Sequence, residues 1–464
     1  MRLTRRQVLV GAATSGLGAV GMYELVDRLT SSPAPRGHGR LHPEQHLLDG
    51  LAVMRDNGVA VVVPPLHHAV ITARVATDDL RGAQQELEET LVDLERRYAP
   101  TPAGLGVTVA WGLPYFRRYV PRQADLHLPV DLRASRTKRR TARALAEAIR
   151  FPSDPPDTIL EANDVAVLLR SDVRAHIEDG ERRLFRGSRI LHATSIRRGF
   201  VGSDFRARPS LAKRMAQAAG VDGADLIPDD AQLFLGFTST QQAALGPRRI
   251  ANFETLGYVD LGPAGYFRNG THMHLSHVFE DLASWYQTFD FQERVDTAFK
   301  PGLEAKPGVV TVSQGATEAA SAASVRRGFH RDGRIGHSSS IQSTSRLVRD
   351  VVADDGTVYR RGTAVPQRAD FNTLDNPFAW SASPERDGMQ DPPAAGLHFV
   401  VFNPTSDDFR RNRLAMDGVL PDGTRLPFGS RDRKQGFNAV LSTSHRQNFI
   451  VPPRRHRSFP LVEL

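Results

Sequence analysis

The first half of the chain alternates between strand-like and helix-like patterns of apolar residues. Residues 67–75 alternate in the manner of a β-strand, and leucines then follow at helical spacing, at Leu80, Leu87, Leu91 and Leu94. We expect Asp78 or Asp79 to cap this helix, because a carboxylate satisfies its first free backbone amides. A glycine-flanked strand over residues 104–116 comes next, and a buried strand over residues 165–169 leads into a second helix. The order strand, helix, strand, strand, helix is typical of a ferredoxin-like α+β unit.

The second half repeats this order without repeating the sequence. Residues 231–239 have the pattern of a strand, residues 277–299 that of one amphipathic helix, residues 396–405 that of a strand, and residues 406–418 that of a short helix. No fixed period is visible, so the duplication is inferred from structure alone. The pattern predicts two ferredoxin-like halves of the dimeric α/β-barrel type, with antiparallel sheets packed together and helices outside. A ligand would then fit between sheet and helix.

The strand pattern is interrupted near residues 206–228, which sets the predicted boundary between the halves. We assign residues 36–215 to the first half and residues 216–464 to the second, which carries the candidate pocket. Residues 1–35 are a signal and the start of a linker rich in Pro, Gly and Ser.

The composition excludes several classes of binding and catalytic site. The 464 residues can bury a large core, enough for two or three domains or for two fused into one body. The 60 Lys and Arg exceed the 52 Asp and Glu, giving +8, but the basic residues are scattered and resemble no nucleic-acid-binding module. The absence of cysteine excludes disulfides, thiolate metal sites, iron–sulfur clusters and cysteine nucleophiles. Metal chemistry would therefore use His, carboxylate or a preformed cofactor.

The N-terminus has the layout of a twin-arginine export signal. Arg5 and Arg6 precede an uncharged, moderately apolar run over residues 7–23. An ordinary membrane anchor is less favoured, because Gly, Ser and Thr dilute the run. No small-residue cleavage site stands out, so the signal could stay as a membrane tether. We expect an exported protein, extracellular or in the cell envelope, and many clients of this route carry a cofactor inserted before export.

Several segments of the second half occur in a recognisable order. Residues 270–299 hold a strand start and the core Asp281, Leu282 and Trp285, followed by His337, by an Arg-Arg-Gly segment at residues 360–362, and by strands over residues 396–405 and 448–453. This order resembles the C-terminal half of the dye-decolourising haem peroxidase family, as a divergent member. The first half is compatible with it.

The resemblance implies roles for individual residues. His337 takes the position of the proximal ligand of haem b iron. Arg360 takes the place of the distal arginine, which helps bind hydrogen peroxide and stabilises charge as the O–O bond separates. Asp407 or Asp408 is the candidate partner of the proximal imidazole, whose second N–H usually donates to a carboxylate.

The chain departs from the family in its first half. The family's Gly-x-x-Asp-Gly motif carries an Asp over the distal haem face, and this chain keeps Gly199 and Phe200 but has Gly202 in the place of the Asp. Asp204 is the substitute that a remodelled loop would allow as acid/base. In the family, arginine alone sometimes sustains peroxide cleavage, so the change bears on rate and mechanism more than on haem binding.

Each candidate also has an ordinary structural interpretation. A histidine in a Gly/Ser-rich loop is commonly a surface residue, and His330 competes with His337 although its charged surroundings favour a turn. His272 and His274 could chelate a metal from one face of a strand, but no carboxylate completes a site, so we interpret them as strand residues that line the pocket at most. Arg360 could be a solvated strand-end charge and Asp204 a turn residue. Trp285 could pass oxidising equivalents outward, as could Tyr359, but is more simply a core residue.

The sequence therefore predicts a haem peroxidase that oxidises a small-molecule electron donor with hydrogen peroxide. The alternative is a non-catalytic relative that carries haem or binds another ligand, and the missing Asp favours it. A structural surface protein held by its uncleaved signal is a third interpretation. No Gly-x-Ser-x-Gly elbow, Walker loop or His-Glu-x-x-His helix points to another enzyme class.

Overall fold

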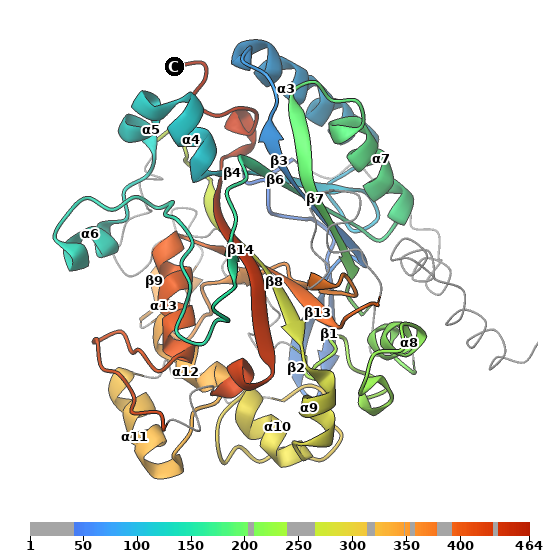
Figure 1. Cartoon of the computed structure of the whole chain (residues 1–464), viewed down its shortest axis with the longest axis vertical. Helices are drawn as coiled ribbons and strands as arrows, with labels where there is room; N and C mark the ends of the chain where they lie inside the picture. Colours follow the sequence, from blue (N-terminus) through green and yellow to red (C-terminus); the bar gives the residue numbers. More distant parts are fainter. Residues whose placement is uncertain are drawn as a thin grey trace, which may run out of the picture.

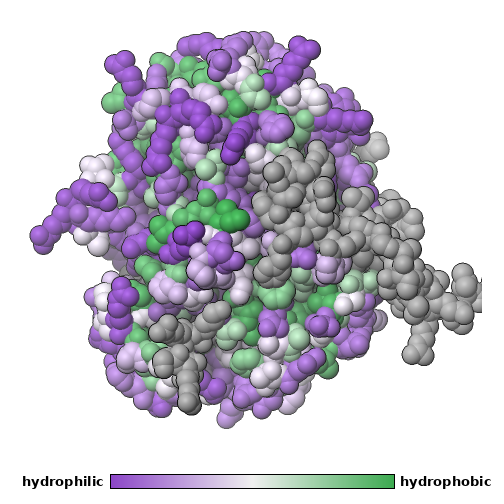
Figure 2. All heavy atoms as spheres, viewed as in Figure 1, coloured by the Kyte–Doolittle hydropathy of each residue, from purple (hydrophilic) through white to green (hydrophobic). Residues whose placement is uncertain are grey.

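The computed structural model describes residues 41–202, 208–238, 265–312, 321–347, 349–352, 358–377, 392–429 and 435–464. The predicted signal and Asp204 lie outside these ranges. No helix within them combines the length and apolar character needed to cross a membrane. Figure 2 shows a face covered mostly by hydrophilic side chains, with smaller apolar patches between them.

The first half is an antiparallel sheet with helices on its outside. It runs β3 (His67–Val75), α3 (Leu80–Arg97), β4 (Gly106–Gly112), β6 (Val165–Ser171), α7 (Arg174–Phe185) and β7 (Leu191–Phe200), and the strands pair in the order β7-β3-β6-β4. This is the ferredoxin-like strand order. The shorter elements between β4 and β6 are α4 (Leu113–Tyr119), α5 (Pro121–His127), α6 (Leu132–Lys138) and β5 (Ile159–Leu160).

The second half repeats the same strand order. Its strands β8 (Thr271–Glu280), β12 (Phe371–Thr373), β13 (Gly396–Asn403) and β14 (Leu441–Val451) pair in the order β12-β13-β8-β14. Its helices are α9 (Leu282–Gln287), α10 (Phe291–Ala298), α11 (Ala322–Asp332), α12 (His337–Ser345) and α13 (Ser406–Met416). The predicted α+β fold of two ferredoxin-like halves is confirmed.

The two sheets close into one ring. β12 pairs with β7 at one junction and β14 pairs with β4 at the other. Figure 1 shows α3 and α7 beside the strands of the first half, while α12 and α13 lie beside β14 and β8. The smaller elements are β1 (Ala52–Asp56), β2 (Val59–Val63), α8 (Leu211–Ala218), η1 (Ala224–Leu226), β9 (Val351–Val352), β10 (Val358–Tyr359), β11 (Gln367–Arg368), η4 (Gly436–Ala439) and η5 (Arg454–His456).

Local sequence explains the start of α3. Asp79 is its N-cap, and its Oδ1 accepts a hydrogen bond from the backbone N–H of Gly82 at 3.0 Å. The helix then buries Ala83, Leu87, Leu91 and Leu94 against the first sheet, which is the apolar stripe that the leucine spacing predicts.

The predicted strand over residues 231–239 is wrong, because residues 231–238 form bends and turns. Side chains from distant elements satisfy their backbone groups instead. The Asn372 side chain accepts from the N–H of Phe234, while Trp285 Nε1 donates to the carbonyl of Leu235 at 2.9 Å. Gly236 also has φ +81, a left-handed conformation that a regular strand does not contain.

The single helix predicted over residues 277–299 is also wrong. β8 continues to Glu280, and two helices follow it. Asp281 caps the first and Asp290 the second, through a capping box with Glu293. Trp285 is fully buried in the first of these helices, as its core interpretation predicts. The predicted boundary between residues 215 and 216 falls inside α8 and stays a prediction.

Candidate functional site

The main cavity of the described residues lies between the sheet of the second half and its helices. It holds about 1460 Å³ of empty space, counting its open mouth. One wall comes from β8, β13 and β14, and the other from α12, α13 and residues 435–439. Most of the lining is apolar, in the manner of a site for a large organic ligand, with aromatic rings from Phe237, Phe299, Phe399, Phe409 and Phe437. The lining groups with charge or titratable protons are Asp154, Glu280, His337, Arg368, Asp370, Arg413 and Arg446.

His337 reaches this cavity as the first residue of α12, not from a loop as the sequence predicts. The run over residues 328–342 instead contains the end of α11, a short turn and the start of α12. The backbone at this point is fixed by α10, since the N–H of Ser339 donates to the carbonyl of Phe299 at 2.9 Å. The Phe437 ring lies 4.6 Å from the imidazole.

The imidazole of His337 is in the form that binds metals. Burial lowers its pKa to about 3, helped by the positive charges of Arg368 and Arg413, so the ring is neutral near pH 7. Its Nδ1 is buried and has no hydrogen-bond partner among the described residues. A neutral imidazole with a free nitrogen is a suitable axial ligand for haem iron.

Gly336 is the residue that allows this placement. A Cβ at residue 336 would lie 2.6 Å from the carbonyl oxygen of Asp296 and closer still to that of Phe299. We therefore expect Gly336→Ala to lower the free energy of unfolding by about 1–3 kcal/mol, as overpacking does, measured by urea denaturation. Gly328→Ala in α11 is the matched control, because a Cβ there meets nothing within 4 Å and should be neutral or slightly stabilising. Equal effects of the two changes would contradict this assignment.

Arg360 does not line the cavity. Its side chain is 77% exposed beside β10 and forms an ion pair with Asp350 at 2.6 Å. This surface position does not fit the pocket role predicted for it, and matches the alternative of a solvated strand-end charge. Arg368, in β11, lines the cavity instead and lies 3.5 Å from Asp370. In the sequence, Arg368 is a single arginine with no recognisable motif around it.

A buried charge cluster of Asp154, Arg413 and Arg446 lines part of the cavity. Asp154 Oδ1 accepts hydrogen bonds from Arg446 at 2.5 Å and from Arg413 at 3.3 Å. Both guanidinium groups also lie over the Phe151 ring, at 4.8 and 5.2 Å. Burial lowers the pKa of Arg446 to about 10, which still leaves it charged at pH 7. Charge pairing therefore fixes this wall.

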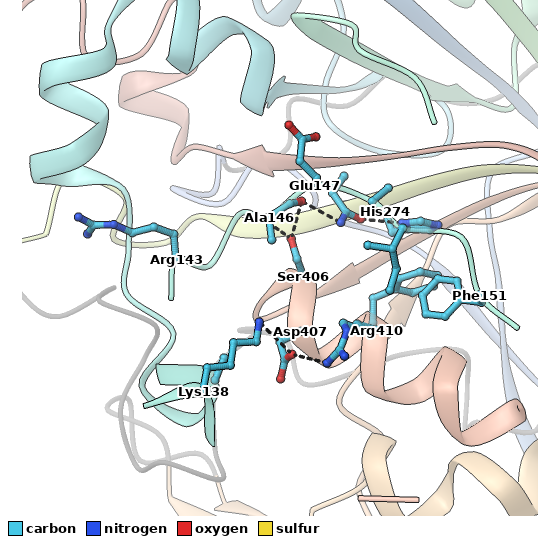
Figure 3. Close-up of a pocket in the computed structure, with 14 residues that line it drawn as sticks. Lys138, Arg143, Ala146, Glu147, Phe151, His274, Ser406, Asp407 and Arg410 are labelled. Carbon is cyan, nitrogen blue, oxygen red and sulfur yellow. Dashed lines mark hydrogen bonds and ion pairs between the residues drawn. The ribbon is translucent and has the colours of Figure 1, made fainter. Parts of the chain in front are cut away.

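Asp407 and Asp408, the candidate partners of His337, lie in the first turn of α13, and neither lines the main cavity. Both form ion pairs with Arg133, at 3.4 and 2.7 Å. Figure 3 shows Lys138 and Arg410 also directed at Asp407, in a smaller pocket beside the main cavity.

Gly202, which stands where the sequence resemblance implies an acid, is tightly packed. A Cβ at Gly202 would lie 2.8 Å from the Cα of Gln232, so no larger side chain fits without a backbone shift. Asp204, the predicted substitute, lies outside the described residues.

The other candidate histidines, His272, His274 and His330, do not line the main cavity. His330 is exposed in α11, which is a helix and not the predicted turn. His272 and His274 are buried in β8, and both ring nitrogens of His274 are engaged, with Asn448 Oδ1 at 2.7 Å and Ser276 Oγ at 2.6 Å. In the described residues no group of three or more His, Asp or Glu side chains could hold a bare metal ion. A single imidazole suits iron that a porphyrin already holds.

Solved structures of similar shape are described as dye-decolourising peroxidases. One from Cellulomonas bogoriensis is 18% identical, with a TM-score of 0.47, covering 89% of this chain and 96% of that one. An encapsulated one from Mycobacterium smegmatis is 10% identical, with a TM-score of 0.44, covering 85% and 95%. A Rhodococcus jostii variant in complex with heme is 13% identical, with a TM-score of 0.46, covering 86% and 96%. At these values the similar structures do not by themselves assign an activity to this chain.

No curated protein matches the sequence. A family model does match, over residues 65–453, and it is described as a family of unknown function. Because this match spans both ferredoxin-like halves and the cavity, the chain belongs to that family, DUF7405.

Proposed function

We propose that this protein is a haem-dependent peroxidase that oxidises a small-molecule electron donor with hydrogen peroxide. The observation that carries the proposal is His337, a neutral imidazole with an unpartnered buried nitrogen at the wall of a large apolar cavity. The ordered motifs of the second half, which resemble those of dye-decolourising peroxidases, add support. Export by the twin-arginine route belongs to the same proposal, since that route accepts proteins folded around a cofactor.

The lining residues fit haem. His337 would hold the iron, and the apolar side chains of Phe299, Ile341, Met416 and Phe437 would exclude water from the macrocycle. When bound, haem would supply the redox centre that passes electrons from the donor to peroxide. Asn412 is the proposed acceptor for the second imidazole N–H, because its Oδ1 is also buried without a partner among the described residues and lines the same cavity.

Arg368 is the residue that we assign to peroxide. Its guanidinium belongs to the sheet wall of the cavity, whereas His337 belongs to the helical wall. A planar cation hydrogen-bonds a peroxide oxygen and stabilises the negative charge that develops as the O–O bond lengthens. The overall reaction consumes two protons and two electrons for each molecule of hydrogen peroxide and gives two molecules of water.

We expect Arg368→Ala to lower kcat/KM for hydrogen peroxide by at least about 100-fold, the usual cost of removing one electrostatic stabiliser. The measurement is peroxide-dependent oxidation of a reducing dye by the haem-loaded protein. Arg360→Ala is the control and should retain full activity, because its side chain lies on the surface. A larger loss in Arg360→Ala than in Arg368→Ala would contradict the assignment.

The second candidate function is non-catalytic haem binding. The tight packing at Gly202 favours it, because an acid at this position would place its Cβ 2.8 Å from the Cα of Gln232. In that case the protein would take up haem and show its spectrum, but peroxide would cause no oxidation of the dye, and Arg368→Ala would change nothing.

A further inference from the structure

Glu280 is a buried carboxyl group that the proposed function does not yet use. It is the last residue of β8, 3% exposed, and its side chain lines the main cavity. Its Oε2 is buried and has no hydrogen-bond partner in the described ranges. A carboxyl group left in this state is costly to bury, so its retention in the wall of a ligand cavity points to a function.

Asp370 lines the same cavity and lies close enough to Glu280 to act on it electrostatically. Asp370 has a cation beside it, because Arg368 Nε lies 3.5 Å from Asp370 Oδ1. Two carboxyl groups in the wall of one apolar cavity disfavour ionisation of both, because their negative charges repel each other in a site of low dielectric constant. Because Asp370 is the carboxyl group that pairs with Arg368, we assign the proton to Glu280.

We propose that Glu280 and Asp370 together replace the acid that is missing at Gly202 and transfer the protons of hydrogen peroxide in this cavity. This inference rests on the proposed peroxidase function. Both carboxyl groups come from the second half of the chain, whereas the family's acid comes from the first. The side chain of Arg368 binds the same substrate beside them.

In the proposed step, hydrogen peroxide loses one proton to Asp370 and gains one from Glu280. The Asp370 carboxylate accepts the proton of one peroxide oxygen, and the Glu280 carboxyl donates its proton to the other oxygen. The O–O bond breaks, and the doubly protonated oxygen leaves as water with the electron pair of that bond. The proton on Asp370 then passes to Glu280, so the pair ends with the one proton with which it began. Two electrons from the donor, which haem would relay, and two protons from solvent reduce the remaining oxygen to a second water.

The protonation state of Glu280 agrees with this role. Burial raises its pKa to about 8, and the negative charge of Asp370 adds to the shift. Tyr286 on α9 is the other titratable group that faces it, and the Arg294 guanidinium lies 5.1 Å from that ring. Glu280 therefore carries a proton at pH 7, where an exposed glutamate does not.

A direct test is to compare the wild-type full chain with Glu280→Gln by infrared spectroscopy at pH 7. We expect a protonated-carboxyl band in the wild type, lost in Glu280→Gln and kept in Glu304→Gln, whose side chain is exposed. This measurement needs no haem and no turnover. Persistence of the band in Glu280→Gln would overturn the assignment of the proton.

The catalytic part is tested on the haem-loaded protein. We expect Glu280→Gln to lower the rate of peroxide reduction by about 100-fold or more, the usual contribution of general acid catalysis, with the haem spectrum unchanged. Glu280→Asp keeps the acid and should recover part of the rate. If the wild type binds haem but does not react with peroxide, the proposed function fails. If the wild type reacts and Glu280→Gln reacts equally fast, the function stands and this inference is overturned.

Discussion

Asp154→Ala is expected to lower the free energy of unfolding by about 3–5 kcal/mol, the usual cost of removing one partner of a buried ion pair. The change leaves Arg413 and Arg446 in the cavity wall without their shared anion, and Arg446 is only 1% exposed. Asp417 still pairs with Arg413 at 2.9 Å, so Arg446 bears most of the loss. The backbone N–H of Phe151 also loses its acceptor, at 2.7 Å.

Urea denaturation at neutral pH measures this effect. Glu147→Ala is the matched control, because Glu147 pairs with Arg117 on the surface, where both side chains are about half exposed or more. That change should cost less than about 1 kcal/mol, as exposed pairs do. Similar losses in the two variants would show that Asp154 does not hold the cavity wall as described.

Much of the architecture follows from local sequence. The leucine spacing of α3 and its Asp79 cap, the strands β4 and β13, and the helix α13 all follow from period and capping alone. Each of these elements carries its own signal, because its buried face is apolar and its ends have the right capping groups. The order of the elements was then enough to predict two ferredoxin-like halves.

The failures lie where distant side chains decide the local structure. Residues 231–238 have a strand-like composition, but side chains from Asn372, Trp285 and Tyr286 take their backbone hydrogen bonds. No local pattern shows this competition.

Local sequence indicates only some residues of the candidate site, because distant elements bring the others into the cavity. His337 is near a recognisable set of motifs, so its order in the chain was informative. The paired arginines at residues 360 and 361 match the expected motif, whereas Arg368 does not. The position of Arg368 depends on how β11 pairs with β13. Glu280 falls inside a predicted helix. In the structure it is the last residue of β8, because Asp281 caps α9 one residue later.

A haem titration followed by visible absorption tests whether His337 holds haem iron in this cavity. We expect the wild-type chain to bind haem with the sharp Soret band of an imidazole-ligated iron. His337→Ala should lose that band and bind haem at least about tenfold more weakly, since even changes around a ligand often cost that much. His330→Ala, on the exposed side of α11, should behave as the wild type. A wild-type protein that takes up no haem, or a His337→Ala variant with an unchanged spectrum, would contradict the claim.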